Sequence, residues 1–244
     1  MLEIRDLTIT AQRRNLVQDL SLKVPGQGIT ALLGPSGCGK TSVLKWLAGI
    51  LPKGLRARGA LRLDGRDCAA QLPALAYQPQ SDALFPWLTI AENAALGLRV
   101  GGLSAAEARA RVLPLFAPFG LQGTEGSFPE ALSGGMRQRA AFLRTMVQDS
   151  RYVLLDEPFS ALDAVTRLRM QSWLLDRLAA HPRGVLLVTH DLQEAAALAD
   201  RICVMTRSRL VTLPVDLPYS ARSEAAMAPL REQLKSLLLE ERLP

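Results

Sequence analysis

Apolar and polar residues alternate over the N-terminal part of the chain, which predicts an antiparallel β-layer there. The alternation is regular over residues 2–9 and looser over residues 16–24. A period of two residues turns one face of a strand toward a core and the other toward water. A short strand over residues 59–63, ending in the turn at Asp64-Gly65, completes the predicted layer.

Farther along the chain, apolar runs without alternation predict strands that are buried on both faces. These runs occupy residues 29–33, 75–77, 152–155 and 184–189. Helical stretches follow at residues 41–48, at 163 to about 180, and in a short Ala-rich segment after His190-Asp191, and two more strands are expected at 202–205 and 209–213. Strands that alternate with helices indicate an α/β fold with a parallel sheet, whose chemistry lies at the C-terminal strand ends.

The region of about residues 82–150 interrupts this alternation and predicts a helical insertion. Thr89 and Ser104 are suited to cap two helices, and Ser104 forms the capping-box pattern S-x-x-E with Glu107. A third helix is expected after the turn at residues 132–135.

Prolines shortly after residue 213 predict a linker that ends near Glu224, followed by an amphipathic helix over residues 229–243. The predicted organisation is one domain over residues 1–213, in which the insertion forms a helical subdomain. Residues 214–244 are then a linker with a C-terminal helix.

Composition and charge exclude some classes of protein and leave others open. With 48% hydrophobic residues among 244, the chain has enough apolar side chains for a sizeable core. No run reaches the roughly 18 consecutive apolar residues of a membrane-spanning helix, and the N-terminus lacks a signal-peptide pattern, so we expect a cytosolic chain. A net charge of +6 fits a surface for nucleic acid or an anionic membrane, and equally an Arg-rich surface that is simply solvated. The basic residues form no dense run, and we predict no nucleic-acid partner.

Residues 34–41, GPSGCGKT, fit the phosphate-loop pattern G-x-x-x-x-G-K-[ST] between a predicted strand and a predicted helix. Glycines let the backbone curl so that its N–H groups point at a triphosphate, and the helix adds the positive end of its dipole. Lys40 is expected to reach the β- and γ-phosphates, and Thr41 to hold Mg²⁺. Cys38 is interpreted as a small filler of the loop, with a reactive thiol as the alternative. The predicted nucleotide-binding residues are Gly34, Pro35, Ser36, Gly37, Cys38, Gly39, Lys40, Thr41 and Ser42.

Two carboxylates, Asp156 and Glu157, follow the apolar strand at residues 152–155. Asp156 is placed to orient the coordination shell of a Mg²⁺ ion, and Glu157 to polarise a water molecule as a general base. An acidic helix cap after a strand is the alternative. The phosphate loop upstream favours the catalytic interpretation.

A second anion cradle is predicted at residues 132–135, where a serine and two glycines open a helix. A chain with one phosphate loop has little need of a second cradle for its own nucleotide. Two copies arranged head to tail explain it, because each cradle then closes the nucleotide of the other copy. The alternative is an ordinary Ser-Gly-Gly helix cap.

Together these residues resemble the ATP-binding-cassette (ABC) ATPases over about residues 2–213. The motifs follow the family's order: Walker A at 34–41, the Q-loop glutamine at Gln80, the LSGGQ signature at 132–136, Walker B and the catalytic glutamate at Asp156 and Glu157, the D-loop at Ser160, Ala161, Leu162 and Asp163, and the switch histidine at His190. The resemblance implies a P-loop NTPase fold of the ABC cassette type, with a RecA-like core, an antiparallel β subdomain and a helical subdomain.

By this resemblance the chain is an ATPase that uses ATP and Mg²⁺. Catalytic roles are implied for Gln80, Glu157 and His190, and metal coordination for Thr41, Gln80 and Asp156. The second ATPase in the sandwich is either another copy of the chain or a homologous subunit. The residues implied to contact the nucleotide of that partner are Ser133, Gly134, Gly135 and Met136.

The sequence departs from the family pattern at two places. Met136 stands where the signature usually has glutamine, a change that resembles importer ATPases. Residues 10–14 contain no aromatic residue that could stack on adenine. Either an arginine stacks on the base or the base is held loosely, and we predict weak discrimination between ATP and GTP.

The segment Phe85-Pro86-Trp87 resembles the Q-loop flank of prokaryotic importers, where the membrane subunit docks. Leu84, Phe85 and Trp87 are candidates for an apolar docking groove, with a place in the core as the alternative. Residues 215–218 and the helix after them resemble the tail of the nitrate, sulfonate and taurine importer branch.

These resemblances imply an ATP-binding and ATP-hydrolysing subunit of a prokaryotic importer for a small solute, peripheral to the cytoplasmic face of the inner membrane. Its implied partners are a transmembrane permease in the Q-loop groove, a second ATPase, and a periplasmic or surface solute-binding protein. The alternatives are a lipid- or export-type ABC subunit, and a soluble ABC ATPase acting on a cytosolic scaffold as in iron–sulfur assembly. The expected cargo is an anion or a small heterocycle such as a pyrimidine precursor.

Overall fold

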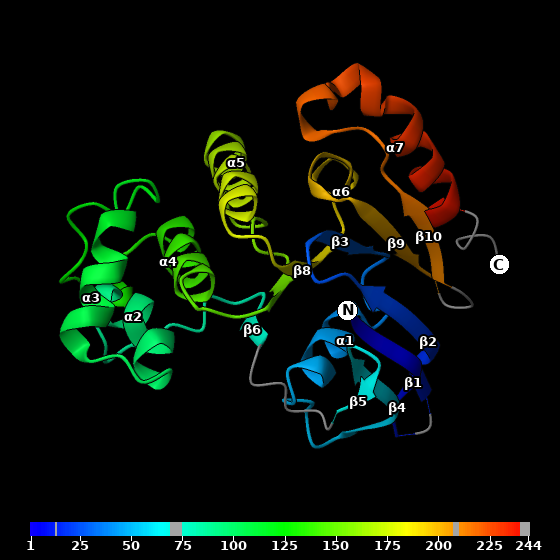
Figure 1. Cartoon of the computed structure of the whole chain (residues 1–244), viewed down its shortest axis with the longest axis horizontal. Helices are drawn as coiled ribbons and strands as arrows, with labels where there is room; N and C mark the ends of the chain where they lie inside the picture. The colour runs from blue at the N-terminus through cyan, green and yellow to red at the C-terminus, as the bar shows by residue number, and fades with distance from the viewer. Residues whose placement is uncertain (13, 69–74, 207–209, 240–244) are drawn as a thin grey trace.

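Two β-sheets and a lobe of helices make up the fold, which we describe from a computed structural model (Figure 1). The structure describes residues 1–12, 14–68, 75–206 and 210–239. An antiparallel sheet has the strand order β2-β1-β4-β5. Its strands are β1 (Leu2–Ala11), β2 (Arg14–Val24), β4 (Leu55–Leu63) and β5 (Arg66–Asp67).

The antiparallel layer predicted from the alternation is confirmed, but the predicted start of its third strand at residue 59 is wrong. β4 begins at Leu55 and pairs with β1 from Leu55 opposite Ala11 to Leu63 opposite Leu2, with one irregularity at Gly59. Residues 56–60 are exposed and therefore carry no alternating pattern. Backbone pairing with β1, rather than burial of side chains, extends this strand.

The larger sheet has the strand order β10-β9-β3-β8-β7-β6. β3 pairs in parallel with β8 and β9, β7 pairs in parallel with β6 and β8, and β10 runs antiparallel to β9. The parallel sheet predicted from the apolar runs is confirmed, while Arg209, the predicted start of the last strand, lies outside the described residues. The strands are β3 (Gly28–Leu33), β6 (Leu75–Gln78), β7 (Tyr152–Asp156), β8 (Gly184–Thr189), β9 (Arg201–Met205) and β10 (Leu210–Pro214).

Helices follow the strands, and α2, α3 and α4 gather in a lobe at one side of the larger sheet, at the left of Figure 1. The α-helices are α1 (Lys40–Leu47), α2 (Ile90–Val100), α3 (Ala105–Val112), α4 (Gly134–Met146), α5 (Ala164–Ala180), α6 (Leu192–Leu198) and α7 (Glu224–Leu239). Short 3-10 turns lie at Leu113–Leu115, Pro129–Ala131 and Tyr219–Ala221. Within the described ranges, no helix has the length and apolar character needed to cross a membrane.

Side-chain caps begin the three helices of the lobe. Thr89 and Ser104 each form the complete capping box with the glutamate three residues on, as predicted for Ser104. Ser133 caps α4, so this helix begins at Gly134 rather than after Gly135, and both glycines lie in its first turn. The boundary moves because the serine side chain replaces the missing helical partner of a first-turn N–H group.

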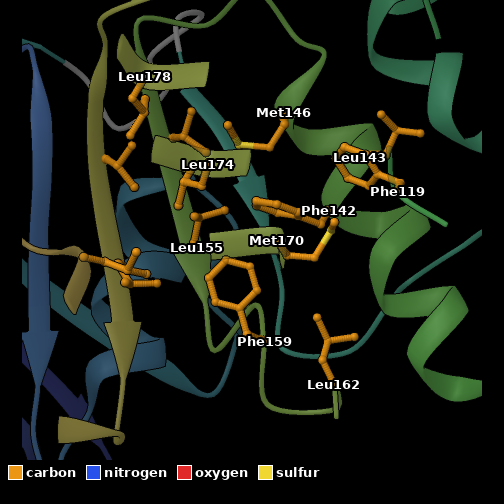
Figure 2. Packing of buried hydrophobic residues seen from close by; sticks show 14 of the residues in the cluster. Phe119, Phe142, Leu143, Met146, Leu155, Phe159, Leu162, Met170, Leu174 and Leu178 are labelled. Atoms are coloured by element: carbon orange, nitrogen blue, oxygen red, sulfur yellow. The ribbon is translucent and has the colours of Figure 1, made fainter. Parts of the chain in front are cut away.

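Two hydrophobic clusters pack on opposite faces of the larger sheet. Leu154 packs toward α1 and the antiparallel sheet, and its neighbour Leu155 packs toward the lobe, because side chains alternate along a strand. Aromatic rings continue the second cluster into α4: the ring centroid of Phe142 lies 5.2 Å from that of Phe159 and 5.8 Å from that of Phe119 (Figure 2). The lobe therefore shares its core with the sheet.

The chain after β10 is anchored to the sheet. The Tyr219 hydroxyl donates to a carboxylate oxygen of Asp200 at 2.8 Å. The same oxygen accepts a hydrogen bond from the N–H of Ile29, at the start of β3, at 2.8 Å. Arg222 adds a hydrogen bond to the carbonyl oxygen of Ala199. These contacts hold the segment between β10 and α7 against the edge where β3 begins.

The predicted start of the last helix at Pro229 is wrong, because α7 begins at Glu224 and includes Pro229. Met227, in the extra turn, is buried, as is Leu234 farther on. Burial of this apolar face outweighs the helix-breaking tendency of proline at the sixth helical position. The predicted end of the helix near residue 243 lies outside the described residues.

Candidate active site

The phosphate loop joins β3 to α1, and two of its glycines have backbone angles that other residues rarely adopt. Gly37 has a φ of 79° and Gly39 a φ of 101°, both in the left-handed region. A Cβ atom on Gly39 would also lie 2.5 Å from Cγ2 of Val17. The tight curl of the loop therefore depends on glycine at these positions.

Lys40 is the first residue of α1, and its side chain folds back over the loop. Its Nζ donates to the carbonyl oxygens of Gly34 at 2.7 Å and of Pro35 at 2.9 Å. The residue is only 6% exposed. An ammonium group over a curled loop at a helix N-terminus makes this place suited to anionic groups.

Asp156 ends β7 and is fully buried beside Thr41. Its Oδ1 accepts a hydrogen bond from Oγ1 of Thr41 at 3.1 Å, whereas its Oδ2 has no hydrogen-bond partner in the described part of the chain. Burial raises the pKa of Asp156, and the hydrogen bond from Thr41 acts in the opposite direction. A buried carboxylate oxygen without a partner is unfavourable by itself, and two neighbouring oxygen donors fit a hard divalent cation.

Glu157 directly follows β7, and it is contacted by residues that follow the two strands beside β7, namely β6 and β8. Its Oε2 accepts a hydrogen bond from Nε2 of Gln80 at 3.1 Å, and its Oε1 lies 3.0 Å from Nδ1 of His190. Its backbone has a φ of 49°, and its N–H donates to the carbonyl oxygen of Val188. β6, β7 and β8 are adjacent parallel strands, so residues after their C-terminal ends meet at one edge. The structure thus brings together the three residues predicted for catalysis.

Glu194 is a buried acid beside this set that the sequence patterns do not single out. Its Oε2 accepts a hydrogen bond from the hydroxyl of Thr189 at 3.2 Å. Burial, together with the nearby charge of Asp191, raises the pKa of Glu194 to about 8. Thr189 and Asp191 flank His190 in the chain, so Glu194 supports the loop that carries His190. The sequence feature that could have pointed to Glu194 is a glutamate in the first turn of an Ala-rich helix.

The signature turn opens α4 and packs against the D-loop of the same chain. Ser133 Oγ accepts a hydrogen bond from the N–H of Met136 at 3.3 Å. A Cβ atom on Gly135 would lie 3.6 Å from the carbonyl oxygen of Ala161 and 3.8 Å from Cδ2 of Leu162. Within the described ranges, no hydrogen bond joins the signature turn to the phosphate loop. The structure therefore does not bring these two predicted cradles together in one chain.

The D-loop itself connects Glu157 to α5. Ser160 Oγ donates to the carbonyl oxygen of Glu157 at 3.0 Å, and Leu162 is buried in the core. Asp163 caps α5 by accepting a hydrogen bond from the N–H of Thr166 at 3.0 Å. The loop is thus fixed at both ends, between Glu157 and the signature turn.

A cavity of about 490 Å³ extends from the phosphate loop along β2. None of the described residues that line it is aromatic. This agrees with the absence of an aromatic residue from positions 10–14 of the sequence. Arg13 lies outside the described part of the chain. On β2 the cavity presents one apolar side chain, Leu16, and three polar ones. The cavity is lined by Arg14, Asn15, Leu16, Gln18, Pro35, Ser36, Gly37 and Cys38.

The segment after Gln80 exposes two aromatic side chains. Trp87 is 69% and Phe85 is 38% exposed, and their ring centroids lie 5.3 Å apart. Asn93 of α2 holds the segment by accepting from the N–H of Phe85 and donating to its carbonyl oxygen. Leu84 instead packs against the core shared by the sheet and the lobe. Two of the three predicted groove residues are therefore exposed, and the third is partly buried against the core.

Known proteins resemble this chain over most of its length. Residues 17–160 match the family described as ABC transporter. The formylaminopyrimidine import ATP-binding protein ThiZ of Halalkalibacterium halodurans is 38% identical over 93% of this chain and 92% of its own length. The aliphatic sulfonates import ATP-binding protein SsuB of Mycobacterium avium is 42% identical over 91% and 84%. The taurine import ATP-binding protein TauB of Mesorhizobium japonicum is 42% identical over 88% and 82%.

Solved structures match the fold as well. An ATP-binding subunit of an ABC transporter superposes with a TM-score of 0.79 at 28% identity, covering 98% of this chain and 99% of that one. A dimeric ATP-binding cassette in a post-hydrolysis state, bound to ADP and Pi, superposes with a TM-score of 0.77 at 25% identity, covering 89% of this chain and all of that one. These matches agree with the fold class expected from the sequence.

Proposed function

This chain belongs to the ABC transporter family and is one of its ATP-binding, ATP-hydrolysing subunits, and on that premise we propose that it drives the import of a small solute through a partner permease. The observation that carries the proposal is the short segment from Gln80, which contacts Glu157, to the exposed pair Phe85 and Trp87. Adjacent exposed aromatic rings are typical of a surface that contacts another protein. The segment thus links the site of hydrolysis to a docking surface.

We propose residues 1–213 as the ABC ATPase domain, with residues 82–150 as its helical subdomain and residues 214–244 as a C-terminal extension. The aromatic core that runs from the sheet into α4 supports treating the lobe as part of this domain. The contacts of Tyr219 with the sheet support close attachment of the extension.

Hydrolysis is proposed to occur by attack of water on the γ-phosphate of ATP held in the loop at residues 34–41. The loop N–H groups and Lys40 bind the phosphates and stabilise the charge that develops in the transition state. Glu157 accepts a proton from the attacking water, while Gln80 and His190 hold its carboxylate in place at 3.1 Å and 3.0 Å. The oxygen of water bonds to phosphorus as the bond to ADP breaks, which gives ADP and phosphate.

Thr41 and Asp156 are proposed to hold Mg²⁺, in keeping with the buried, unpartnered Oδ2 of Asp156. When bound, the ion neutralises negative charge on the β- and γ-phosphates. Gln80 is the third proposed ligand. Its amide nitrogen donates to Glu157, which leaves the amide oxygen for a cation.

Two copies of the ATPase, or this chain and a homologous one, are proposed to close head to tail on two ATP molecules. Ser133, Gly134, Gly135 and Met136 of each then contact the γ-phosphate that the other holds. In support, the signature turn offers the N–H groups of a helix start, and one similar solved structure is a dimer bound to ADP and Pi.

The proposed docking partner is a membrane-spanning permease, which makes the chain a peripheral subunit at the cytoplasmic face of the inner membrane. A periplasmic or surface solute-binding protein completes the proposed complex, and no nucleic acid takes part. Relatives carry names for the import of sulfonates, taurine and a formylaminopyrimidine, so we propose a small organic anion or heterocycle as cargo. The same names favour import over export, lipid transport or a cytosolic scaffold.

Affinity purification of the tagged chain from its own membranes in mild detergent, followed by mass spectrometry, tests this proposal. A multispanning permease is expected to co-purify, and a double Phe85→Ser/Trp87→Ser variant is expected to lose it while keeping ATP affinity. A Val100→Ser variant is the control, because Val100 is 82% exposed at the end of α2 that lies away from this segment. A stoichiometric partner that is purely cytosolic would remove the chain from transport.

A further inference from the structure

Two arginines of α4 hold the segment that follows Gln80. Arg144 donates to the carbonyl oxygens of Asp82 at 2.9 Å and Ala83 at 2.7 Å. Arg137 donates through Nε to the carboxylate of Asp82 at 3.0 Å. The segment is therefore attached to α4 through its backbone and through a side chain.

Arg137 makes a second contact with the other side of its guanidinium group. Its Nη1 donates to the carbonyl oxygen of Leu132 at 2.7 Å. Leu132 directly precedes Ser133, the cap of the signature helix. One side chain thus joins the flank of Gln80 to the start of the signature turn, a connection that the rigid fork of an arginine can make. We call these contacts the Asp82–Arg137–Leu132 relay.

The parts joined by the relay are stiff. Ala83 has a φ of 45°, a left-handed angle that persists in a non-glycine residue only where the surroundings fix it. The N–H of Leu84 donates to Oδ1 of Asp82 at 3.2 Å. α4 is fixed in turn by the packing of Phe142 in the shared core (Figure 2). A displacement of the segment is therefore passed to α4 rather than absorbed by bending.

We propose that Asp82 and Arg137 are positioning residues that set the signature turn relative to the docking surface at Phe85 and Trp87. Contact of a permease with that surface then changes how Ser133 meets the nucleotide held by a second copy. The inference rests on the proposed head-to-tail arrangement of two ATPases. The two side chains are 31% and 35% exposed, and ion pairs this exposed add little to the free energy of unfolding. Loss of the pair is expected to change position rather than folding.

The test uses the full chain carrying Glu157→Gln, which is expected to bind ATP without hydrolysing it and to accumulate as a dimer. Asp82→Asn is added because it removes the charge and keeps the size of the side chain. Sedimentation at several protein concentrations gives the dimer dissociation constant in saturating ATP. A fluorescence titration at low protein concentration gives the ATP affinity of the monomer. Asp67→Asn is the matched control, because it removes an ion pair with Arg62 in the antiparallel sheet.

We expect Asp82→Asn to raise the dimer dissociation constant about tenfold, because each dimer holds two relays worth roughly threefold each. The ATP affinity of the monomer and the melting temperature stay at the parent values. Asp82→Glu is expected to restore most of the dimer affinity. Arg137→Gln is expected to raise the dimer dissociation constant less in the Asp82→Asn background than alone, because the two changes remove the same contacts.

A dimer dissociation constant equal to that of the Asp67→Asn control would overturn the relay and leave the ATP sandwich intact. A parallel loss of ATP affinity in the Asp82→Asn monomer would also overturn it, because the pair would then act on its own nucleotide site. A Glu157→Gln parent that stays monomeric in saturating ATP would overturn the sandwich, and the relay with it.

Discussion

Two helices of this chain begin with glycine-rich turns, and the two turns are completed in different ways. Before α1, the cap residue Gly39 has a left-handed backbone and forms no side-chain cap, and Lys40 folds over the loop. Before α4, the side chain of Ser133 caps its own helix, which continues with Gly134 and Gly135. The cation of the first turn, Lys40, lies over the loop itself. The cation at the second turn, Arg137, is instead paired with the carboxylate of Asp82.

On the proposed function, this difference distinguishes a complete phosphate-binding site from one half of a shared site. The loop before α1 lies beside Asp156, whose hydrogen bond to Thr41 ties the loop to the end of β7. The turn before α4 lies beside the D-loop, at Ala161 and Leu162. On the proposed mechanism, the first turn binds ATP alone, and the second acts only on a phosphate that another chain presents.

The largest effect is expected from Glu157→Gln, which removes the proposed general base beside the phosphate loop. ATP hydrolysis falls by about a thousandfold, because a positioned base contributes on the order of 10²–10⁴ in rate. ATP affinity is retained. Phosphate release measures the rate, and Glu130→Gln, an exposed acid near the signature turn, serves as the control. A rate above a tenth of the wild-type value would exclude Glu157 as the base.

Lys40→Ala is expected to weaken the binding of ATP at the phosphate loop. ATP affinity falls about thirtyfold, because hydrogen bonds from a charged group are worth roughly 1.5–3 kcal/mol each. Isothermal titration checks the affinity, and Lys53→Ala outside the loop is expected to bind as wild type. Unchanged affinity in Lys40→Ala would mean that the loop does not supply its own cation to the nucleotide.

Ser133→Ala sharpens the comparison, with Ser104→Ala as its control. Both changes remove a helix cap and cost about 1 kcal/mol of stability. Only Ser133→Ala is expected to lower the turnover rate at saturating ATP, by about tenfold, since the loss of one hydrogen bond to a charged group costs at least roughly 1.5 kcal/mol. The ATP affinity of the monomer stays the same. Equal turnover in the two variants would reduce the signature turn to an ordinary cap.

The smallest effect is expected on exchanging ATP for GTP. If the base occupies the cavity beside β2, it meets Leu16 and polar side chains, and no aromatic residue is among the described lining residues. The two nucleotides are therefore expected to bind within about threefold of each other. Competition binding measures the ratio. A preference for ATP of more than tenfold would show that the site does discriminate between adenine and guanine. Arg14→Ala tests whether the guanidinium group contributes to either affinity.

Local patterns in the sequence predict the parts of this molecule that local chemistry determines. Apolar runs identify the strands of the larger sheet, and the box formed by Ser104 and Glu107 marks a helix start. The pattern at residues 34–41 identifies the loop because left-handed angles at Gly37 and Gly39 require glycine. Each of these signals lies within a few residues of the feature that it predicts.

Contacts between distant residues could not be predicted in this way. Arg137 pairs with Asp82, 55 positions earlier, and Arg144 reaches Ala83 across 61 positions. Nothing in the neighbourhood of either arginine distinguishes it from the other basic residues of α4. The burial of Glu194 likewise depends on how α6 packs against β8, which sets its surroundings and its pKa.

The order of strands in the larger sheet has a consequence for the synthesis of the protein. β3, which leads into the phosphate loop, leaves the ribosome early, but both strands that pair with it, β8 and β9, come from the last third of the chain. Pairings between such distant segments form late and slowly. A nascent chain that stops before residue 184 therefore carries every glycine of the loop without the sheet that supports it. The ability to bind nucleotide is expected to arise in one late step, when translation is nearly complete.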